Sequence, residues 1–474
     1  MGRLVVVSNR TANLAKKNQP GGLTVGIIDA LRSQGGLWMG WDGNVQDAVG
    51  DLRRSEHGNI SILTTPLTNA EHEQYYLGFS NKVLWPAFHN RLDLMDYRTE
   101  FVDRYSAVNE RFAKLLAPQL ENDDVIWIHD YHLMPMAAEL RKLGIDNRIG
   151  FFLHIPFPPV DVFSAVPRHP WLRYCLLQYD LVGFQTLNDV HNFHRYLEEH
   201  SDADIISPEL VRVRERTVHI GHYPIGIDVK QFAQTSSKPD DAVELERMRR
   251  KVLRRFQLIS ADRLDYSKGL PHRIKAFRKF LDLYPEYQGH AEYLQIASPS
   301  REDVSAYGDI RAELEQLAGA VNGKFADFNW APIQYINRSI PRTKLAPLFK
   351  SSLIGLITPL RDGMNLVAKE YVAAQDDSDP GILILSKFAG AAEELREAIL
   401  VNPYNIQEVA EAIHKAATMP LEERQLRHRK LLRRVTDHDA QWWQRKYLNA
   451  LLGHAEQQAQ SSGRLAPAEA HPNV

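Results

Sequence analysis

The feature that most constrains the fold is an alternation of short apolar runs with longer helical segments. The run "RLVVVSN" precedes "LTVGIIDALRSQ", "DVIWIHD" precedes "LMPMAAELRKLG", and "RIGFFLHIP" and "LVGFQT" follow. A second series contains "RFQLISA", "AEYLQIAS", "LIGLIT" and "GILILS", each followed by a loop and a helical pattern. This rhythm is typical of βαβ units around a parallel sheet. The predicted fold class is therefore α/β, with one doubly wound domain for each series.

A polar stretch, "QTSSKPDDAVELERMRRK", separates the two series. A chain of 474 residues is also longer than a single core usually fills. We expect a first domain over residues 1–232, a second over residues 233–440, and a helix over residues 441–455 that packs back on the first domain. Residues 456–474 lack apolar periodicity and are predicted to be disordered. Ligands of open α/β sheets bind beyond the carboxyl ends of the strands, so two facing sheets predict a cleft between the domains.

Charge and cysteine content exclude several classes of protein. A formal net charge of −2 gives no general basic field, so we expect no nucleic-acid partner. The single cysteine, Cys175, allows no intrachain disulfide and fits a reducing compartment. No apolar run approaches the roughly 20 residues of a membrane span, and no signal-peptide pattern is present. We therefore expect a cytoplasmic protein with no membrane partner.

The segment "TPLRDGMNLVAKEYVAAQ", residues 358–375, has the form of an anion site. Gly363 suits a left-handed or closely approached backbone, and Asn365 is a good N-cap. The amides of Leu366 and Val367 at the following helix start would then attract phosphate. Glu370, one turn further on, can accept two hydroxyl hydrogen bonds, as a ribose offers. A nucleotide-sugar pocket is the functional interpretation, and a plain helix start with a solvated carboxylate is the alternative.

Two other loops strengthen the phosphate interpretation. The strand "FQLISA" ends at a loop that carries Arg263 and Lys268, two cations that can converge on one diphosphate. The first strand ends at Arg10, and Gly21 and Gly22 open the helix that follows, where a phosphate or sugar can approach closely. Solvated surface charges and an ordinary helix start are the alternatives.

The stretch "WIHDYHLM" places His129, Asp130 and His132 at the end of a strong strand. Two histidines and an aspartate can bind a metal, but no third partner stands at a recognisable spacing. A ligand-contacting Asp130 is favoured over a metal site, and structural polar capping is the other alternative. We expect no metal and no cofactor.

Several long motifs, in order along the chain, resemble the bacterial trehalose-6-phosphate synthases. They are "VVVSNR…GG", "LWPAFH", "WIHDYHL", "FFLHIPFP", "RLDYSKG", "PLRDGMNLVAKEYVAAQ" and "LSKFAGAAEEL", and the resemblance covers about residues 1–455. It implies a retaining, metal-independent glucosyltransferase of the GT-B fold, with two Rossmann-like domains flanking a cleft. Such enzymes join glucose from UDP-glucose to glucose 6-phosphate, giving α,α-trehalose 6-phosphate and UDP. The resemblance also implies a homo-oligomer, a tetramer, and a role in osmoprotection.

The resemblance assigns residues to each substrate. The catalytic set is Asp362, His154, Arg263 and Lys268. The donor set is Gly21, Gly22, Arg263, Lys268, Ile340, Asp362, Leu366, Val367, Ala368, Lys369 and Glu370. The acceptor set is Arg10, Trp41, Tyr76, Trp85, Asp130, Arg301 and Arg342, and Trp85 and Ile155 match positions linked to choice of the α-anomer.

The expected mechanism is front-face substitution. A retaining glycosidase uses two carboxylates about 5 Å apart, whereas here no second acid obviously partners Asp362. Two rivals remain: a sister enzyme that uses ADP- or GDP-glucose or takes glycerol 3-phosphate as acceptor, and a non-catalytic sugar-phosphate sensor. A sensor would be expected to lose a charged donor contact, and Arg263, Lys268, Asp362 and Glu370 are all present.

Overall fold

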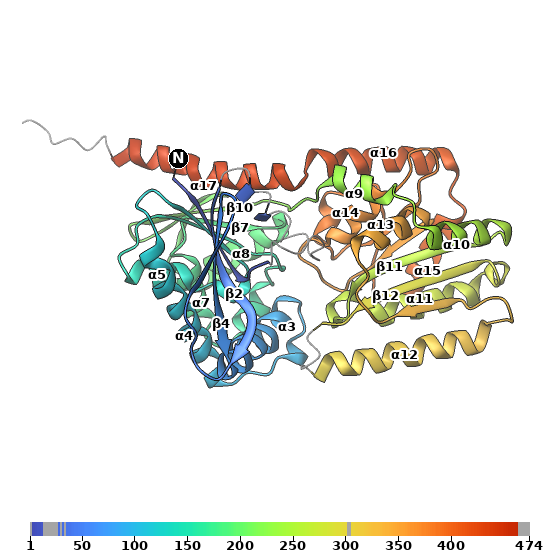
Figure 1. Cartoon of the computed structure of the whole chain (residues 1–474), viewed down its shortest axis with the longest axis horizontal. Helices are drawn as coiled ribbons and strands as arrows, with labels where there is room; N and C mark the ends of the chain where they lie inside the picture. Colours follow the sequence, from blue (N-terminus) through green and yellow to red (C-terminus); the bar gives the residue numbers. More distant parts are fainter. Residues whose placement is uncertain (1, 13–26, 29–30, 33–34, 301–304, 463–474) are drawn as a thin grey trace, which may run out of the picture.

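The computed structural model describes residues 2–12, 27–28, 31–32, 35–300 and 305–462. Two α/β lobes lie side by side, and two long helices near the C-terminus run along one side of both (Figure 1). The predicted α/β fold class is confirmed: each lobe is built on its own mainly parallel sheet. Among the described residues, no helix is both long and apolar enough to cross a membrane.

The first sheet has ten strands in the described residues, in the order β3-β4-β2-β1-β5-β6-β7-β10-β9-β8. Its centre is parallel, and β3, β8 and β9 pair antiparallel at the edges. The bounds are β1 Leu4–Arg10, β2 Gly36–Gln46, β3 Arg53–His57, β4 Ile60–Thr68, β5 Val125–His129, β6 Arg148–Phe152, β7 Leu181–Phe184, β8 Asp204–Ser207, β9 Leu210–Val213 and β10 Arg216–His222.

The second sheet has six parallel strands in the described residues, in the order β13-β12-β11-β14-β15-β16. The bounds are β11 Phe256–Arg263, β12 Ala291–Ser298, β13 Ile333–Ile336, β14 Ile354–Ile357, β15 Ile382–Ser386 and β16 Ile399–Val401. In both sheets the strand order reverses at one point, between β1 and β5 and between β11 and β14. These switch points are where such sheets bind ligands.

Helices cover both faces of each sheet, which is why the central strands are almost continuously apolar. In the first lobe they are α2 Asn69–Glu71, the π-helix η1 His72–Leu84, α3 Trp85–Phe88, α4 Thr99–Leu116, α5 Met136–Lys142, α6 Val160–Ser164, α7 His169–Leu176 and α8 Leu187–His200. In the rest of the chain they are α9 Val229–Ser236, α10 Asp241–Val252, α11 Leu270–Leu283, α12 Ser305–Phe325, α13 Arg342–Ser351, α14 Leu366–Ala374, α15 Ile406–Ala417, α16 Leu421–Asp437 and α17 Ala440–Ser462. Short 3-10 turns connect several of them, including η4 Tyr131–Leu133, η5 Tyr266–Lys268 and η7 Gly390–Glu393.

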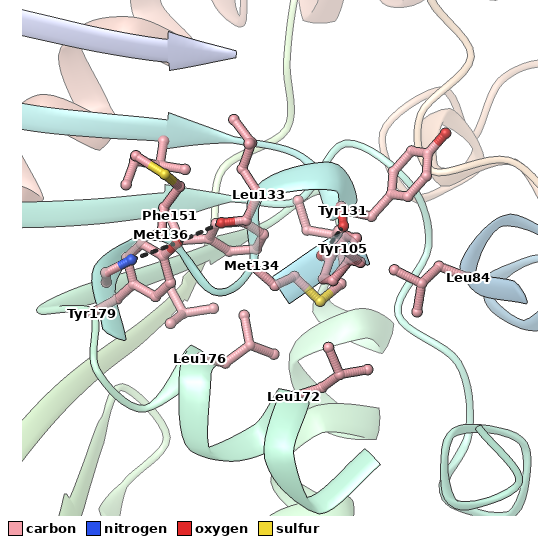
Figure 2. Packing of buried hydrophobic residues seen from close by; sticks show 14 of the residues in the cluster. Leu84, Tyr105, Tyr131, Leu133, Met134, Met136, Phe151, Leu172, Leu176 and Tyr179 are labelled. Carbon is pink, nitrogen blue, oxygen red and sulfur yellow. Dashed lines mark hydrogen bonds between the residues drawn. The ribbon is translucent and has the colours of Figure 1, made fainter. Parts of the chain in front are cut away.

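The core of the first lobe fixes the loop that follows β5. Figure 2 shows Tyr105, Tyr179 and the surrounding leucine and methionine side chains packed beneath this loop. The Tyr105 hydroxyl donates to the carbonyl of Tyr131 at 2.6 Å, and the Tyr179 hydroxyl donates to the carbonyl of Leu133 at 2.9 Å. Both tyrosines are fully buried, so these bonds hold the backbone next to Asp130 in one position.

The lobes meet through backbone contacts as well as side chains. On η7 of the second lobe, Glu393 accepts hydrogen bonds from the amides of Leu187 and Asn188 at 3.0 and 3.3 Å, and so caps α8 of the first lobe. A Cβ atom on Gly363 would lie 2.2 Å from the carbonyl oxygen of His154, so only glycine permits this approach. Gly363 therefore serves the close approach, while the left-handed residue of its loop is Asn365.

The ends of the predicted domains differ from the observed elements in two places. Helix α9 already packs on α13 and α14, with Phe232 stacked on Phe349, so residues 229–232 lie with the second lobe. Helix α17 returns to β6 and β7 of the first lobe and runs to Ser462. The helix thus overlaps residues 456–462 of the predicted tail, and the disorder of that tail stays a prediction. Residues 463–474 lie outside the described residues.

Candidate active site

A cavity of about 270 Å³ lies where the two lobes meet. It is bounded by the residues at the carboxyl ends of β1, β5 and β11, at both switch points. Ten of the predicted site residues line it: Arg10, Trp41, Tyr76, Trp85, Asp130, His154, Ile155, Arg263, Lys268 and Asp362. Asn9, His89, Tyr131 and His132 line it as well and were not predicted as site residues. Gly21, Gly22 and Arg301 lie outside the described residues.

A lysine–aspartate pair forms the floor on the second lobe. Lys268 Nζ lies 2.6 Å from Asp362 Oδ2, and the Asn365 amide donates to the same oxygen at 3.0 Å. Burial alone would raise the pKa of Asp362, but the charge and hydrogen bond of Lys268, aided by His89 and Asn365, lower it overall. The cavity therefore presents an ionised carboxylate held beside an ammonium group.

Arg263 joins this charged group from the end of β11. Its guanidinium lies 5.4 Å from the centre of the Trp85 ring, so it crosses from the second lobe to an aromatic side chain of the first. The turn that carries Lys268 is fixed by Asp265, which accepts from the Ser267 amide at 2.9 Å, and by left-handed Gly269. Arg263 and Lys268 thus converge on one cavity, as their spacing predicted.

The predicted N-cap of α14 is confirmed. Asn365 is left-handed, with a φ of 75°, and its side chain accepts from the amide of Ala368 at 3.1 Å. This bond occupies the Ala368 amide, while the amides of Leu366 and Val367 belong to the helix start that has no intrahelical partner. Ile340 packs on the same apolar cluster as Leu366 and Val367.

Two of the assigned side chains form ion pairs with other protein side chains. Lys369 is buried and turned into the lobe interface, where its ammonium lies 2.6 Å from Glu394 and donates to the carbonyl of Ile225 at 2.8 Å. The ammonium group of Lys369 thus contacts protein groups, and the assignment of the segment 366–370 to the donor stays a prediction. Arg342, assigned to the acceptor, pairs with the carboxylate of Glu370, the residue that follows Lys369 on α14. Successive helical residues point about 100° apart, so Lys369 and Glu370 face different partners.

Burial and Arg342 act in opposite directions on Glu370. Burial is the larger effect and raises the pKa of Glu370, while the guanidinium of Arg342 opposes it. Arg342 lies on α13 of the second lobe, pairs with the carboxylate predicted to bind ribose and is not among the residues that line this cavity, and its assignment to the acceptor stays a prediction.

Aromatic rings form the wall on the first lobe. Tyr76, on η1, stacks on His72 and on His132 with ring centres 5.5 and 5.9 Å away, and Trp41 lies 5.4 Å from it. The Arg10 guanidinium lies 5.5 Å from the centre of the Trp41 ring. Aromatic faces next to a cation suit a pyranose that carries a phosphate.

Asp130 is held at the cavity by a strained backbone. Its φ is 76°, its amide donates to the carbonyl of Phe152 at 2.8 Å, and its Oδ1 accepts from the amide of His154 at 3.2 Å. His129 instead turns inward to His154, and His132 turns to Tyr76. His129 and Asp130 therefore both contact His154, through its ring and its amide, whereas His132 stacks on Tyr76.

His154 uses its ring inside the protein. Its Nε2 lies 3.0 Å from His129 Nδ1, and its Nδ1 lies 3.5 Å from the side-chain nitrogen of Gln185. Burial lowers the pKa of His154 to about 3, so the ring is neutral near pH 7. In this structure the histidine is a neutral part of the cavity wall, with one ring N–H and one lone pair.

Trp443 of α17 packs against both His129 and His154, and it was not predicted as a site residue. It is fully buried, with ring centres 5.0 Å from Trp127, 5.2 Å from Phe152 and 6.1 Å from His154. The C-terminal helix thus reaches the wall of the cavity. No local sequence signal could reveal this, because the contact requires the chain to return to the first lobe.

Facing α/β lobes with a charged, aromatic-lined cavity at their switch points have the architecture of GT-B glycosyltransferases. The model of glycosyltransferase family 20 matches residues 3–452, and the chain belongs to this family of enzymes. A trehalose-6-phosphate synthase of Sodalis glossinidius is 47% identical over 95% of this chain and 96% of its own, and one of Citrobacter koseri is 45% identical over 98% of both. The structure of a UDP-forming α,α-trehalose-phosphate synthase of Burkholderia vietnamiensis superposes with a TM-score of 0.92 at 43% identity, covering 96% of this chain and 99% of that one.

Replacing Trp443 by alanine is expected to destabilise the first lobe. Removing a buried tryptophan costs about 3–5 kcal/mol, because the cavity left behind refills only in part. The change is measured as the loss in the free energy of urea unfolding. Trp442, the preceding residue on the helix, is only partly buried and is the matched control. Its replacement by alanine should lower the free energy of unfolding clearly less. Equal losses for the two variants would contradict the supporting role of Trp443.

Stability should fall on acidification below about pH 6.5. Burial lowers the pKa of His154 to about 3 and that of His89 to about 4, both from 6.5. Below pH 6.5 the unfolded chain binds protons that the folded chain does not. The free energy of unfolding is therefore at its full value above pH 6.5. It falls as pH drops toward 4, by about 1.4 kcal/mol per pH unit for each histidine. Urea unfolding at pH 7.5 and 5.5 measures it, and the variant His154→Gln should show a smaller difference; an unchanged difference would contradict the assignment.

Proposed function

We propose that the chain transfers glucose from UDP-glucose to glucose 6-phosphate, releasing UDP and forming α,α-trehalose 6-phosphate, the first step of trehalose biosynthesis. The observation that carries this is the single cavity in which Arg263 and the Lys268–Asp362 pair of one lobe face Arg10, Tyr76 and Asp130 of the other. Solved relatives support it. A trehalose-6-phosphate synthase of Escherichia coli, 46% identical, was solved with UDP-2-fluoro glucose, and one of Burkholderia xenovorans, 44% identical, with glucose-6-phosphate.

The donor is proposed to lie on the second lobe. Arg263 and Lys268 neutralise its diphosphate, with the amides of Leu366 and Val367 and the positive end of α14. Glu370, positioned by Arg342, accepts the ribose hydroxyls. Gly21, Gly22, Ile340, Asp362 and the backbone from Ala368 to Lys369 complete the proposed set.

The acceptor is proposed to lie on the first lobe. Arg10 and Arg301 hold the 6-phosphate by charge-assisted hydrogen bonds, each contributing about 1.5–3 kcal/mol. Tyr76 and Trp41 cover a face of the sugar, and Asp130 accepts from its hydroxyls. Trp85 and Ile155 are proposed to favour the α-anomer by shape.

The reaction is proposed to retain the anomeric configuration by front-face substitution. The bond between the glucosyl C1 and the phosphate oxygen breaks, and the C1 hydroxyl of the acceptor attacks the same face. The departing phosphate takes its proton. Asp362 Oδ2 already accepts from Lys268 and Asn365, which disfavours it as a nucleophile. Arg263 and Lys268 supply the charge that stabilises the leaving group, so no divalent metal is proposed.

A donor and acceptor panel tests the substrates. UDP-, ADP- and GDP-glucose are each offered with glucose 6-phosphate and with glycerol 3-phosphate in EDTA, and the product is identified by the anomeric couplings in its proton NMR spectrum. The proposal predicts one efficient pair, UDP-glucose with glucose 6-phosphate, and two α-anomeric protons in the product. A β-coupling, or faster reaction with another pair, would overturn it.

We also propose a cytoplasmic, homo-oligomeric enzyme, a tetramer, that serves osmoprotection. A reducing compartment is consistent with the single buried cysteine, Cys175. Both proposed substrates are small phosphorylated molecules, and no nucleic-acid or membrane partner is proposed.

A further inference from the structure

His89 lies in the cavity wall and has no role in the assignments above. It caps the C-terminus of α3, four residues after Trp85, and the centres of the two rings lie 4.1 Å apart. The residue is 4% exposed, and the small part of it that is accessible faces the cavity.

One hydrogen bond decides which ring nitrogen of His89 carries the proton. Nδ1 lies 2.7 Å from the carbonyl oxygen of Trp85, and a carbonyl oxygen can only accept. Nδ1 is therefore the N–H donor, and Nε2 of the neutral ring is left with a lone pair. Within the described part of the chain, Nε2 makes no hydrogen bond to protein, although its residue is almost fully buried.

The surroundings keep this ring neutral. Burial is the main reason that the pKa of His89 falls to about 4, and Lys268 contributes in the same direction against the carboxylates of Asp265 and Asp362. Nε2 is not among the buried polar atoms that lack a partner, so its lone pair is accessible from the cavity, where a ligand hydroxyl can donate to it.

We propose that His89 Nε2 accepts a hydrogen bond from a pyranose hydroxyl held beside the Trp85 ring. The proposal rests on the proposed function, since it needs a sugar in this cavity. The hydroxyl belongs either to the glucosyl group of the donor or to the acceptor sugar. Both are the same chemistry, and binding measurements separate them.

Two variants separate substrate contact from a merely structural role. In His89→Asn the side-chain amide can keep the bond to the Trp85 carbonyl but leaves nothing where Nε2 lies. In His89→Gln the longer amide places an acceptor oxygen near the position of Nε2 and gives up the Trp85 bond. A substrate-binding role favours the glutamine variant, whereas a role confined to anchoring Trp85 favours the asparagine variant.

Calorimetric titration of each variant uses UDP-glucose, UDP, glucose 6-phosphate and inorganic phosphate. His89→Asn should bind one of the two sugar ligands about tenfold more weakly than the wild type, the value of one hydrogen bond, with UDP and phosphate unchanged. His89→Gln should recover most of that loss. Loss confined to UDP-glucose assigns the donor hydroxyl, and loss confined to glucose 6-phosphate assigns the acceptor hydroxyl.

Three outcomes would overturn the proposal: unchanged binding by His89→Asn, better retention by His89→Asn than by His89→Gln, or equal losses for all four ligands. Thermal unfolding of both variants identifies loss of fold, and if His89→Asn does not fold, near-native sugar binding by His89→Gln supports the proposal and its loss contradicts it. The wild-type activity is measured separately. If wild-type protein forms no UDP, the proposed function fails, whatever the His89 variants do.

Discussion

Replacing Lys268 by alanine is expected to lower turnover about 10²–10³-fold, the usual cost of removing one preorganised group that stabilises developing charge. Its ammonium lies 2.6 Å from Asp362 at the cavity floor and converges with Arg263, so the site would lose half of its proposed leaving-group charge. The measurement is kcat for UDP release at saturating substrates.

The control is a lysine on the next helix. Lys275 also pairs with a carboxylate, that of Glu313 at 2.8 Å, but this pair lies on the surface and is exposed to solvent. Replacing Lys275 by alanine should therefore leave kcat unchanged. A loss of tenfold or less in the Lys268 variant would demote the residue to substrate binding. The same experiment on Arg263 should give a loss of similar size.

Replacing Asp362 by asparagine is expected to lower turnover by about 10²–10³-fold as well, while the remaining reaction still retains the anomeric configuration. The amide keeps the shape of the carboxylate but no longer holds the ammonium of Lys268 by charge, so the group that stabilises the leaving phosphate loses its fixed position. If the reaction is front-face substitution, mass spectrometry of the wild-type enzyme with a slow fluorinated donor finds no glucosyl adduct.

An adduct on Asp362 would establish a double displacement and contradict the front-face mechanism. Near-native turnover by the asparagine variant would instead remove Asp362 from the reaction. Asn365, which shares the Asp362 oxygen, offers a milder comparison, because replacing it by alanine loses the hydrogen bond and cap but keeps the charge pair.

Local sequence patterns predicted the parts of the site that local structure builds. Arg263 follows a strand, Asn365 begins a helix, and parallel sheets bring such positions to one edge. The pair Trp85 and His89 also carries a local signal, since residues four apart on a helix are neighbours. The two-lobe architecture followed from the alternating runs in the same way.

Contacts between distant segments could not be predicted. Trp443 reaches His154 only because α17 returns to the first lobe, and Lys369 turns away only because Glu394 and the Ile225 carbonyl occupy its side of the helix. Arg342 carried no signal of its partner either, since Glu370 is 28 residues away on another helix. The contacts that the sequence did not reveal are those set by the packing of the lobes.

The most direct test of the account is UDP release by purified protein from UDP-glucose, with and without glucose 6-phosphate, in EDTA throughout. The account predicts release that requires glucose 6-phosphate and is as fast in EDTA as in added magnesium. No release from UDP-glucose with the acceptor present, or release that EDTA abolishes, would contradict it.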